Sequence, residues 1–333
     1  MASTPLPTSV GFTLPDAGLE ARLLSGLAAV EQQLAVAVKS SDNFVSETSR
    51  HLVEAGGKRF RPLLTLLAAE YGDHEAPGVV PSAVVVELTH LATLYHDDVM
   101  DEASRRRGAE SANSRWGNTV AILTGDFLFA RASDILADLG PEAVRLQART
   151  FERLCVGQIR ESVGPAHGTS PVDHHLNVLA DKTGSLIATS ARFGALQSGA
   201  DEAVVDALTR FGERIGVAFQ LADDLVDIIS DSTDSGKTPG TDLREGVPTL
   251  PGLLVLSAAR GDRLSDLLSR PLSEDAEHAE ALVLLRADPA LDEARAEAQR
   301  WAADARDCLV SLPDIPATAA LSSLCDYVVE RTG

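Results

Sequence analysis

The sequence predicts an all-α protein. Apolar residues recur at the three- and four-residue spacing of helices along most of the chain, and no stretch shows the strict alternation typical of a strand. Aromatic residues make up only 4% of the chain, and alanine and leucine dominate its apolar positions. The 333 residues suffice for one large core or two domains. We expect a flexible N-terminal tail over residues 1–18 and a single helical domain over residues 19–333.

The net charge restricts the possible partners. The chain has 29 lysine and arginine residues against 49 aspartate and glutamate residues, a formal charge of −20. Such a charge opposes binding to nucleic acids and to anionic lipid surfaces, so we expect neither. We also expect no transmembrane segment, because the most apolar stretch, residues 79–95, contains Glu87 and His90.

The cysteines and the N-terminal residues indicate the compartment. The tail has neither a basic start nor a long apolar run, so it does not resemble a signal peptide. The number of cysteines is odd and all lie in stretches that look helical, which favours reduced core residues in a cytoplasmic protein. These cysteines are Cys155, Cys308 and Cys325.

The first part of the chain contains one candidate anion site. Helical patterning runs from about residue 19 to residue 39. The glycine pair at 56–57 then allows a sharp turn before an apolar helix predicted over residues 63–70. Lys58 and Arg61 precede that helix, where unpaired amides and the helix dipole attract anions. Solvated charges at an ordinary helix start are the alternative explanation.

Three carboxylates follow the most apolar helical stretch. On a helix, Asp97 and Asp101 are one turn apart and share a face, with Asp98 beside them. Unneutralised carboxylates this close repel one another, and Mg²⁺ binds through one or two carboxylates together with substrate phosphates. The arginines at 105–107 supply planar forks suited to phosphate oxygens. Together these residues indicate a diphosphate bound through a metal.

A second copy of this spacing strengthens the metal hypothesis. Asp223, Asp224 and Asp227 repeat it within another apolar helical stretch. One such cluster would fit a solvated helix face. Two copies, each within a largely apolar helix, favour a functional site, because charged residues are rarely buried unless they are paired or bound to a metal.

Further helices are predicted between the two clusters, one beginning near residue 121 and one over residues 141–161. His174 and His175 follow at the start of another helix. Paired histidines are typical of metal sites, but no third ligand lies nearby in the sequence. We therefore expect both histidines on the protein surface.

Cations lie on both sides of the second cluster. Lys182 and Thr183 precede Gly184, and a glycine inside a helix costs about 1 kcal/mol, so a break or bend in this apolar helix is expected. An ordinary helix with an exposed lysine is the alternative. Lys237 lies in a turn-rich loop over residues 230–250, whose length suggests a lid or binding loop. Beyond it we find only amphipathic helices with acidic faces.

These motifs occur in the order of a trans-polyprenyl diphosphate synthase, and the sequence resembles that family over roughly residues 50–255. The resemblance rests on residues 56–62, 97–108, 182–183, 219–227 and 237–250. It implies an isoprenoid-synthase-type helical bundle around a central cavity, usually a homodimer. It also implies Mg²⁺-dependent trans condensation of isopentenyl diphosphate with an allylic diphosphate.

The resemblance further implies a role for each motif residue. Mg²⁺ would be bound by the two clusters, that is by Asp97, Asp98, Asp101, Asp223, Asp224 and Asp227. We expect Asp97, Asp101 and Asp223 to be direct ligands, and the other three to bind directly or through water. The allylic diphosphate would contact Arg106, Lys182 and Lys237. Isopentenyl diphosphate would contact Lys58, Arg61, His90 and Arg107. Thr183 and Gln220 would direct oxygen dipoles at the allylic cation that forms when the diphosphate leaves.

Small residues before the first cluster predict a long product. Ala92 and Thr93 lie about 6–7.5 Å below Asp97 on a helix that rises 1.5 Å per residue. Short-chain members of the family commonly place bulky aromatics here as the floor of the cavity. We therefore expect an open cavity and a long-chain product of about C30–C50, with each buried CH₂ of the tail gaining about 0.8 kcal/mol. The expected lower limit of the cavity is formed either by Val85 and Leu88 or by Phe127 and Phe129 on a neighbouring helix.

Four other functions compete with this prediction. A short-chain (C15–C20) synthase would differ only in its cavity. A class I terpene cyclase shares the first cluster but typically carries an Asn/Ser/Glu motif in place of the second. A non-catalytic synthase subunit usually lacks some of the aspartates, and none is missing here. A di-iron bundle needs two Glu-x-x-His motifs, whereas only Glu87 and His90 form one in an apolar helix.

Overall fold

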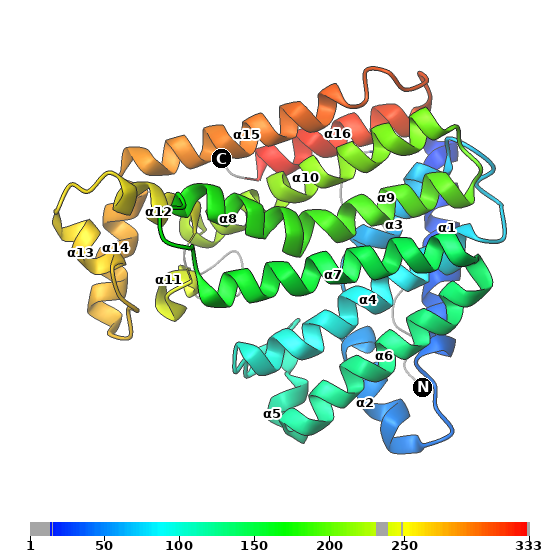
Figure 1. The fold of residues 1–333 in the computed structure, drawn as a ribbon, viewed down its shortest axis with the longest axis horizontal. Coiled ribbons are helices and arrows are strands. Elements are labelled where there is room, and N and C mark those ends of the chain that lie inside the picture. The colour runs from blue at the N-terminus through cyan, green and yellow to red at the C-terminus, as the bar shows by residue number, and fades with distance from the viewer. Residues whose placement is uncertain (1–13, 15, 231–238, 248, 332–333) are drawn as a thin grey trace. The chain divides into compact units, whose positions relative to one another are not determined.

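The computed structural model describes residue 14 and residues 16–230, 239–247 and 249–331, and it confirms the predicted all-α class (Figure 1). Within these residues the strands form one two-stranded hairpin. None of the described helices has both the length and the apolar character needed to cross a bilayer.

The chain divides into two compact units, described here one at a time. The first comprises residues 1–150, 186–209 and 311–323, and the second comprises residues 151–185, 210–310 and 324–333. A single domain over residues 19–333 stays a prediction.

The elements of the first unit are α1 (Ala17–Ala37), α2 (Asn43–Glu54), α3 (Phe60–Ala69), α4 (Val79–Met100), β1 (Arg105–Arg106), β2 (Ala109–Glu110), α5 (Ala112–Trp116) and α6 (Asn118–Leu139). Those of the second unit are α8 (Pro171–Leu179), the π-helical turn η1 (Ala180–Gly184), α11 (Thr241–Glu245), α12 (Leu250–Ser257), α13 (Arg263–Leu268), α14 (Asp275–Arg286) and α15 (Pro289–Asp307). Helices that contribute residues to both units are α7 (Pro141–Val163), α9 (Ser185–Gln197), α10 (Glu202–Ile229) and α16 (Pro316–Glu330).

Helix α4 forms the core of the first unit. It packs against α1, α3 and α6, and α6 runs beside it (Figure 1). Val85, Leu88, Ala92 and Tyr95 have no exposed surface, as expected of a helix covered on several sides. At Gly125 of α6, a Cβ atom would lie 3.1 Å from the carbonyl oxygen of Ala92. This glycine therefore lets α6 approach the helix that carries the first aspartate cluster.

A polar cap fixes the start of the first helix. The side chain of Asp16 accepts a hydrogen bond from the backbone N–H of Leu19 at 2.6 Å, which satisfies an amide that has no partner within the helix. The helix predicted from residue 19 is therefore α1, which begins at Ala17.

The second unit is built around the C-terminal part of α10. Val217, Leu221 and Leu225 of this helix belong to a buried apolar cluster that also includes Leu267 of α13 and Leu291 of α15. Helix α12 contacts α8, α13 and α15. The long helix that carries the second aspartate cluster is thus held by apolar packing on several sides.

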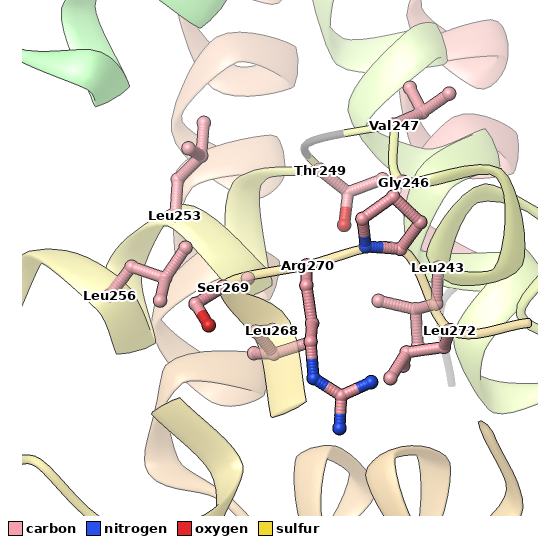
Figure 2. A pocket seen from close by; sticks show the side chains of 12 residues that line it. Leu243, Gly246, Val247, Thr249, Leu253, Leu256, Leu268, Ser269, Arg270 and Leu272 are labelled. Carbon is pink, nitrogen blue, oxygen red and sulfur yellow. The ribbon is translucent and has the colours of Figure 1, made fainter. Parts of the chain in front are cut away.

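A cavity of about 150 Å³ lies beside α12 in the second unit. Leu253, Leu268 and Thr249 line it together with Arg270 (Figure 2). Arg270 donates two hydrogen bonds to the carboxylate of Glu277, at 2.7 and 2.8 Å. Because its cation is already paired and most of its lining is apolar, this cavity is poorly suited to a diphosphate.

The three cysteines differ in exposure. All are free thiols; Cys325 is buried, Cys308 is half-buried and Cys155 is exposed. The prediction of three core cysteines is therefore wrong for Cys155. The buried face of α7 runs through Thr150 and Leu154, and Cys155 is one position away from that face.

Candidate active site

The first aspartate cluster lies at the C-terminal end of α4. Asp97 and Asp98 belong to its last turn, whereas Asp101 is the C-cap residue and donates its backbone N–H to the carbonyl oxygen of Asp97 at 2.8 Å. Asp98 has no exposed surface, Asp97 is half-buried and Asp101 is exposed. The side chains of Asp97 and Asp101 are therefore accessible to a metal ion, while that of Asp98 faces the interior.

Arg106 is the ion-pair partner of Asp98. Its Nε donates to Oδ1 of Asp98 at 2.6 Å, and its Nη2 lies 3.9 Å from Oδ2 of Asp101. Burial raises the pKa of Asp98, Arg106 opposes that rise and Asp101 adds to it. Asp98 thus holds the guanidinium of Arg106 near the exposed carboxylate of Asp101.

The arginines at 105–107 lie in a hairpin that the sequence analysis did not predict. β1 pairs with β2 in antiparallel register, and Arg107 and Gly108 form the two-residue turn with φ values of 52° and 79°. Positive φ at both central positions is typical of the favoured hairpin turns. The hairpin directs Arg106 to the aspartate cluster and Arg107 to the end of α2.

Arg107 packs against the turn that precedes α3. Its Nη1 donates to the carbonyl oxygen of Leu52 at 3.1 Å, and also to that of Gly56. Gly57 has a φ of 151°, and a Cβ atom there would lie 2.9 Å from Cζ of Arg107. The positive φ therefore favours glycine at this position, and any side chain there would displace the guanidinium of Arg107.

The structure brings together three of the four residues predicted to contact isopentenyl diphosphate. Arg61 lies in the first turn of α3, His90 on α4 and Arg107 in the hairpin, while Lys58 is exposed in the turn before α3. Desolvation, followed by the charges of Arg61 and Arg107, holds the pKa of His90 well below its ordinary value, so the ring is neutral at pH 7. Desolvation lowers the pKa of Arg61 to about 10, which leaves it a cation.

Polar contacts also surround the second cluster, on α10 in the second unit. Oγ1 of Thr183 donates to Oε1 of Gln220 at 3.3 Å, and Nε2 of Gln220 donates to Oδ1 of Asp224 at 3.0 Å. Asp224 is buried. The Thr183 hydroxyl binds the oxygen of the Gln220 amide and the buried Asp224 carboxylate binds its nitrogen. These two contacts fix the orientation of the amide.

His175 is part of this cluster, which corrects the prediction that both histidines lie on the surface. Its ring is buried, and its Nε2 lies 3.7 Å from Oδ2 of Asp224 without a hydrogen-bond partner. It shares the buried face of α8 with Val178 and Leu179, three and four positions further on. This helical spacing was the signal in the sequence that could have placed His175 on the buried face. His174 is half-buried.

Asp223 is paired with Arg331, near the C-terminal end. Nη2 of Arg331 lies 2.6 Å from Oδ1 of Asp223, and its guanidinium lies 5.1 Å from the ring centre of Phe219. The side chain of Asp227 accepts the backbone N–H of Asp242 at 3.3 Å. The sequence alone does not point to Arg331, because 108 positions separate it from its partner and no motif marks it.

Lys182 lies in the π-helical turn η1, which joins α8 to α9 without a gap and is the irregularity at the position where a bend or close approach was expected. Its Nζ donates to Oε2 of Glu161 at 2.5 Å. A Cβ atom at Gly157 of α7 would lie 2.8 Å from the backbone nitrogen of Lys182, so α7 approaches this turn closely. Lys237 lies outside the described residues.

The donor atoms at both clusters suit a hard divalent cation. They are carboxylate oxygens, which Mg²⁺ and Ca²⁺ prefer, and Oδ2 of Asp98 is buried without a hydrogen-bond partner. Among the described residues, no group of three or more aspartate, glutamate, histidine or cysteine side chains is gathered closely enough to enclose a metal by itself. Mg²⁺ typically keeps waters and takes further oxygens from substrate phosphates, so protein ligands alone need not enclose it.

Comparison with known proteins identifies the family. The polyprenyl synthetase family model matches residues 42–285. A nonaprenyl diphosphate synthase of Mycobacterium tuberculosis is 49% identical over 333 residues, covering 99% of each chain. A geranylgeranyl pyrophosphate synthase of Corynebacterium glutamicum, crystallised with calcium and isoprenyl diphosphate, has a TM-score of 0.86 and 43% identity over 96% of this chain and 99% of its own. A decaprenyl diphosphate synthase of Rhodobacter capsulatus has a TM-score of 0.86 and 34% identity over 95% and 99%. The chain therefore belongs to the polyprenyl synthetase family, which confirms the predicted assignment as a trans-polyprenyl diphosphate synthase, a prenyltransferase.

Proposed function

We propose that this prenyltransferase adds isopentenyl diphosphate to an allylic diphosphate in a Mg²⁺-dependent reaction and releases a long-chain product. The observation that carries the proposal is the arrangement around the end of α4. There the exposed carboxylate of Asp101 lies 3.9 Å from the guanidinium of Arg106, which is fixed by the buried Asp98, and the half-buried Asp97 lies one helical turn before Asp101. Carboxylates for a cation and a guanidinium for phosphate oxygens are what a metal-bound diphosphate requires.

The reaction begins with cleavage of the allylic C–O bond. The diphosphate leaves with the electron pair, and the double bond of isopentenyl diphosphate attacks the allylic cation to form the new C–C bond. Loss of a proton from the adjacent carbon then restores an alkene, and an oxygen of the released diphosphate accepts that proton. When bound, Mg²⁺ supplies Lewis acidity and charge neutralisation at the leaving group. Arg106, Lys182 and Lys237 would bind the same leaving group.

The burial of five of the aspartates divides them into two kinds of role in this proposal. Asp97 and Asp101 in the first cluster, and Asp223 in the second, would each be direct metal ligands, because their side chains are at least partly exposed. Asp98 and Asp224 are buried and bonded to Arg106 and Gln220 respectively, so they position those neighbours as well as adding negative charge. Calcium in the Corynebacterium glutamicum structure supports a divalent metal, and oxygen donors make Mg²⁺ our choice.

Isopentenyl diphosphate would bind at Lys58, Arg61, His90 and Arg107. The two guanidinium groups supply charge and paired donors, and the neutral ring of His90 supplies an uncharged hydrogen-bonding group. Arg61→Ala should raise mainly the KM for isopentenyl diphosphate, whereas Lys182→Ala should raise mainly the KM for the allylic substrate. The reverse pattern would exchange the two assignments.

The product length rests on the residues below the first cluster. Ala92 is buried and small, Thr93 is half-buried, and Val85 and Leu88 are fully buried further along α4. Phe129 lies against His96, with ring centres 5.9 Å apart, which places it near the level of the cluster and favours Val85 and Leu88 as the lower limit. The nonaprenyl and decaprenyl synthases among the relatives support a long product. The geranylgeranyl synthase represents the C20 alternative.

One incubation tests the proposal. The purified enzyme should convert farnesyl diphosphate and excess isopentenyl diphosphate to products of about C30–C50 in the presence of Mg²⁺, as measured by mass spectrometry, and chelation of the metal should abolish turnover. Asp97→Ala and Asp223→Ala should each reduce turnover by orders of magnitude while leaving the helical circular dichroism unchanged. Near-normal activity of either variant would refute the metal assignment.

Ala92→Phe tests the cavity separately. The aromatic ring should shorten the product sharply while the first condensations proceed. A wild-type enzyme that stops at farnesyl or geranylgeranyl diphosphate would contradict the long-chain assignment.

We also propose a homodimer and a cytoplasmic location. Ile122 and Leu123 on α6 are 42% and 61% exposed, and adjacent exposed apolar residues of this kind are typical of protein interfaces. Three free cysteines are typical of a reducing compartment. Sedimentation of the wild type and of Leu123→Glu tests the dimer, since the added charge should dissociate it.

A further inference from the structure

Arg59 is a buried cation in the turn that carries Lys58 and Arg61. Its side chain is 2% exposed, and its backbone adopts the left-handed conformation with φ 49° and ψ 36°, which is uncommon for a residue other than glycine. It donates to both oxygens of Glu31, to the carbonyl oxygen of Val53 at 3.1 Å and to Oε1 of Glu87 at 2.8 Å. Contacts with three different segments therefore hold this turn in place.

Glu87 joins this turn to the hairpin. Its side chain is 2% exposed, and the oxygen that accepts from Arg59 also lies 3.8 Å from Nη2 of Arg107. Glu87 lies on α4 three positions before His90, which places the two residues on the same face of the helix. One buried carboxylate thus contacts two guanidinium groups that belong to separate segments.

The charges in this region do not balance. Arg59, Arg61 and Arg107 contribute three positive charges, and Glu31 and Glu87 contribute two negative charges. Glu87 raises the pKa of Arg61, whereas Arg107 lowers it. Glu87 therefore favours the charged state of a guanidinium that it does not bond directly, and the group as a whole keeps an excess of positive charge for an anion.

We propose that Glu87 is a positioning residue for isopentenyl diphosphate, which it orients through Arg59 and Arg107 without contacting the substrate. The inference rests on the proposed function of Lys58, Arg61, His90 and Arg107. Through Arg59, Glu87 fixes the turn that presents Lys58 and Arg61. Through Arg107, it holds the third cation beside His90.

Positioning and simple charge have opposite consequences for binding. A buried carboxylate near an anion site repels the anion, so a purely electrostatic role predicts that Glu87→Gln binds isopentenyl diphosphate more tightly. A positioning role predicts weaker binding, because the uncharged amide oxygen of a glutamine holds Arg59 and Arg107 less firmly than the carboxylate does. The sign of the change in affinity therefore distinguishes the two roles.

The experiment compares wild type, Glu87→Gln and Glu31→Gln. Calorimetry measures the Kd for isopentenyl diphosphate without allylic substrate, and steady-state kinetics measure both KM values. Glu87→Gln should raise the Kd and the KM for isopentenyl diphosphate by about tenfold or more, with the KM for the allylic substrate within about twofold of wild type. Glu31→Gln is the matched control, because Glu31 also pairs with Arg59 but no contact joins it to Arg107 in the described structure. It should change the Kd by less than about threefold.

A double-variant cycle tests the route through Arg107. If Glu87 acts through this arginine, Glu87→Gln should have a much smaller effect in an Arg107→Met background than in the wild type. Glu87→Asp keeps the charge but shortens the side chain, and it should also weaken binding; it replaces Glu87→Gln if that variant does not fold.

Two outcomes overturn the inference: unchanged or tighter binding by the Glu87 variants, or an equal rise of both KM values. Absence of isopentenyl diphosphate binding by the wild type would instead refute the proposed function.

Discussion

Replacing Arg59 by methionine tests how much the buried ion pairs stabilise the first unit. Methionine keeps part of the aliphatic stem but cannot donate, so the variant loses the hydrogen bonds to Glu31, Glu87 and Val53. Glu31 is 13% exposed and can be partly hydrated, whereas Glu87 is 2% exposed and cannot. The main loss is therefore the pairing of Glu87.

The expected loss follows from that burial. Removing one partner of a buried ion pair destabilises a protein by about 3–5 kcal/mol. Arg107 remains 3.8 Å from the orphaned carboxylate, so we expect a value near the lower end, about 3 kcal/mol. This loss is a large part of the typical free energy of unfolding of a folded protein, about 5–15 kcal/mol.

The assay is urea unfolding followed by circular dichroism, with Arg22→Met as the control. Arg22 makes the same paired contact, to Glu70 at 3.0 and 2.6 Å, but its side chain is 40% exposed. Glu70 is 10% exposed but its partner is solvent-accessible, so the control should lose about 1 kcal/mol, clearly less than Arg59→Met. A loss below about 1 kcal/mol for Arg59→Met, or equal losses in the two variants, would refute the reasoning.

Three further predictions concern other parts of the chain. Gly252→Ala should raise the free energy of unfolding by about 0.5–1 kcal/mol, because alanine is favoured over glycine within a helix such as α12. A Cβ atom there would lie 4.0 Å from Leu268 and Thr249 in the cavity, so the methyl group has room. A lower urea midpoint would contradict this prediction. Arg61→Met should stabilise the fold by about 1 kcal/mol while weakening isopentenyl diphosphate binding. Desolvation lowers its folded pKa to about 10, below the ordinary value of an arginine, so folding disfavours the charged form, and the gain should be constant from about pH 6 to 9; a gain that varies across this range would argue against it. Arg331→Met should increase the Mg²⁺ affinity measured by calorimetry, because Arg331 competes with the metal for Asp223. Arg306→Met is the control, and an Arg331→Met affinity equal to that of the control would contradict this competition.

Apolar spacing and motif spacing predicted much of this molecule. The residues of α4 that recur at helical spacing are buried, and the glycine pair before α3 does form a turn with positive φ. The irregularity expected at Gly184 also appears, as a π-helical turn. These features are local, so the spacing of a few neighbouring residues determines them. The roles assigned to the site residues stay predictions.

The features that the sequence did not reveal depend on distant partners. Arg331 meets Asp223 only because the end of α16 returns to α10 within the second unit. The burial of His175 depends on which face of α8 packs inward, and a pair of adjacent histidines does not by itself identify that face. The hairpin at 105–110 was missed because strands of two residues are too short to show alternation.

The contact between Gly57 and Arg107 has a consequence for comparing sequences. A side chain at position 57 would displace the guanidinium of Arg107 from that backbone. A chain that loses this arginine removes the obstruction, so the glycine is then constrained only by its φ of 151°. Among related sequences the two positions should therefore vary together, and an alignment in which the glycine is replaced should show a replaced arginine as well. Such a pair of substitutions would mark chains that have given up this anion site, even where both aspartate clusters are intact.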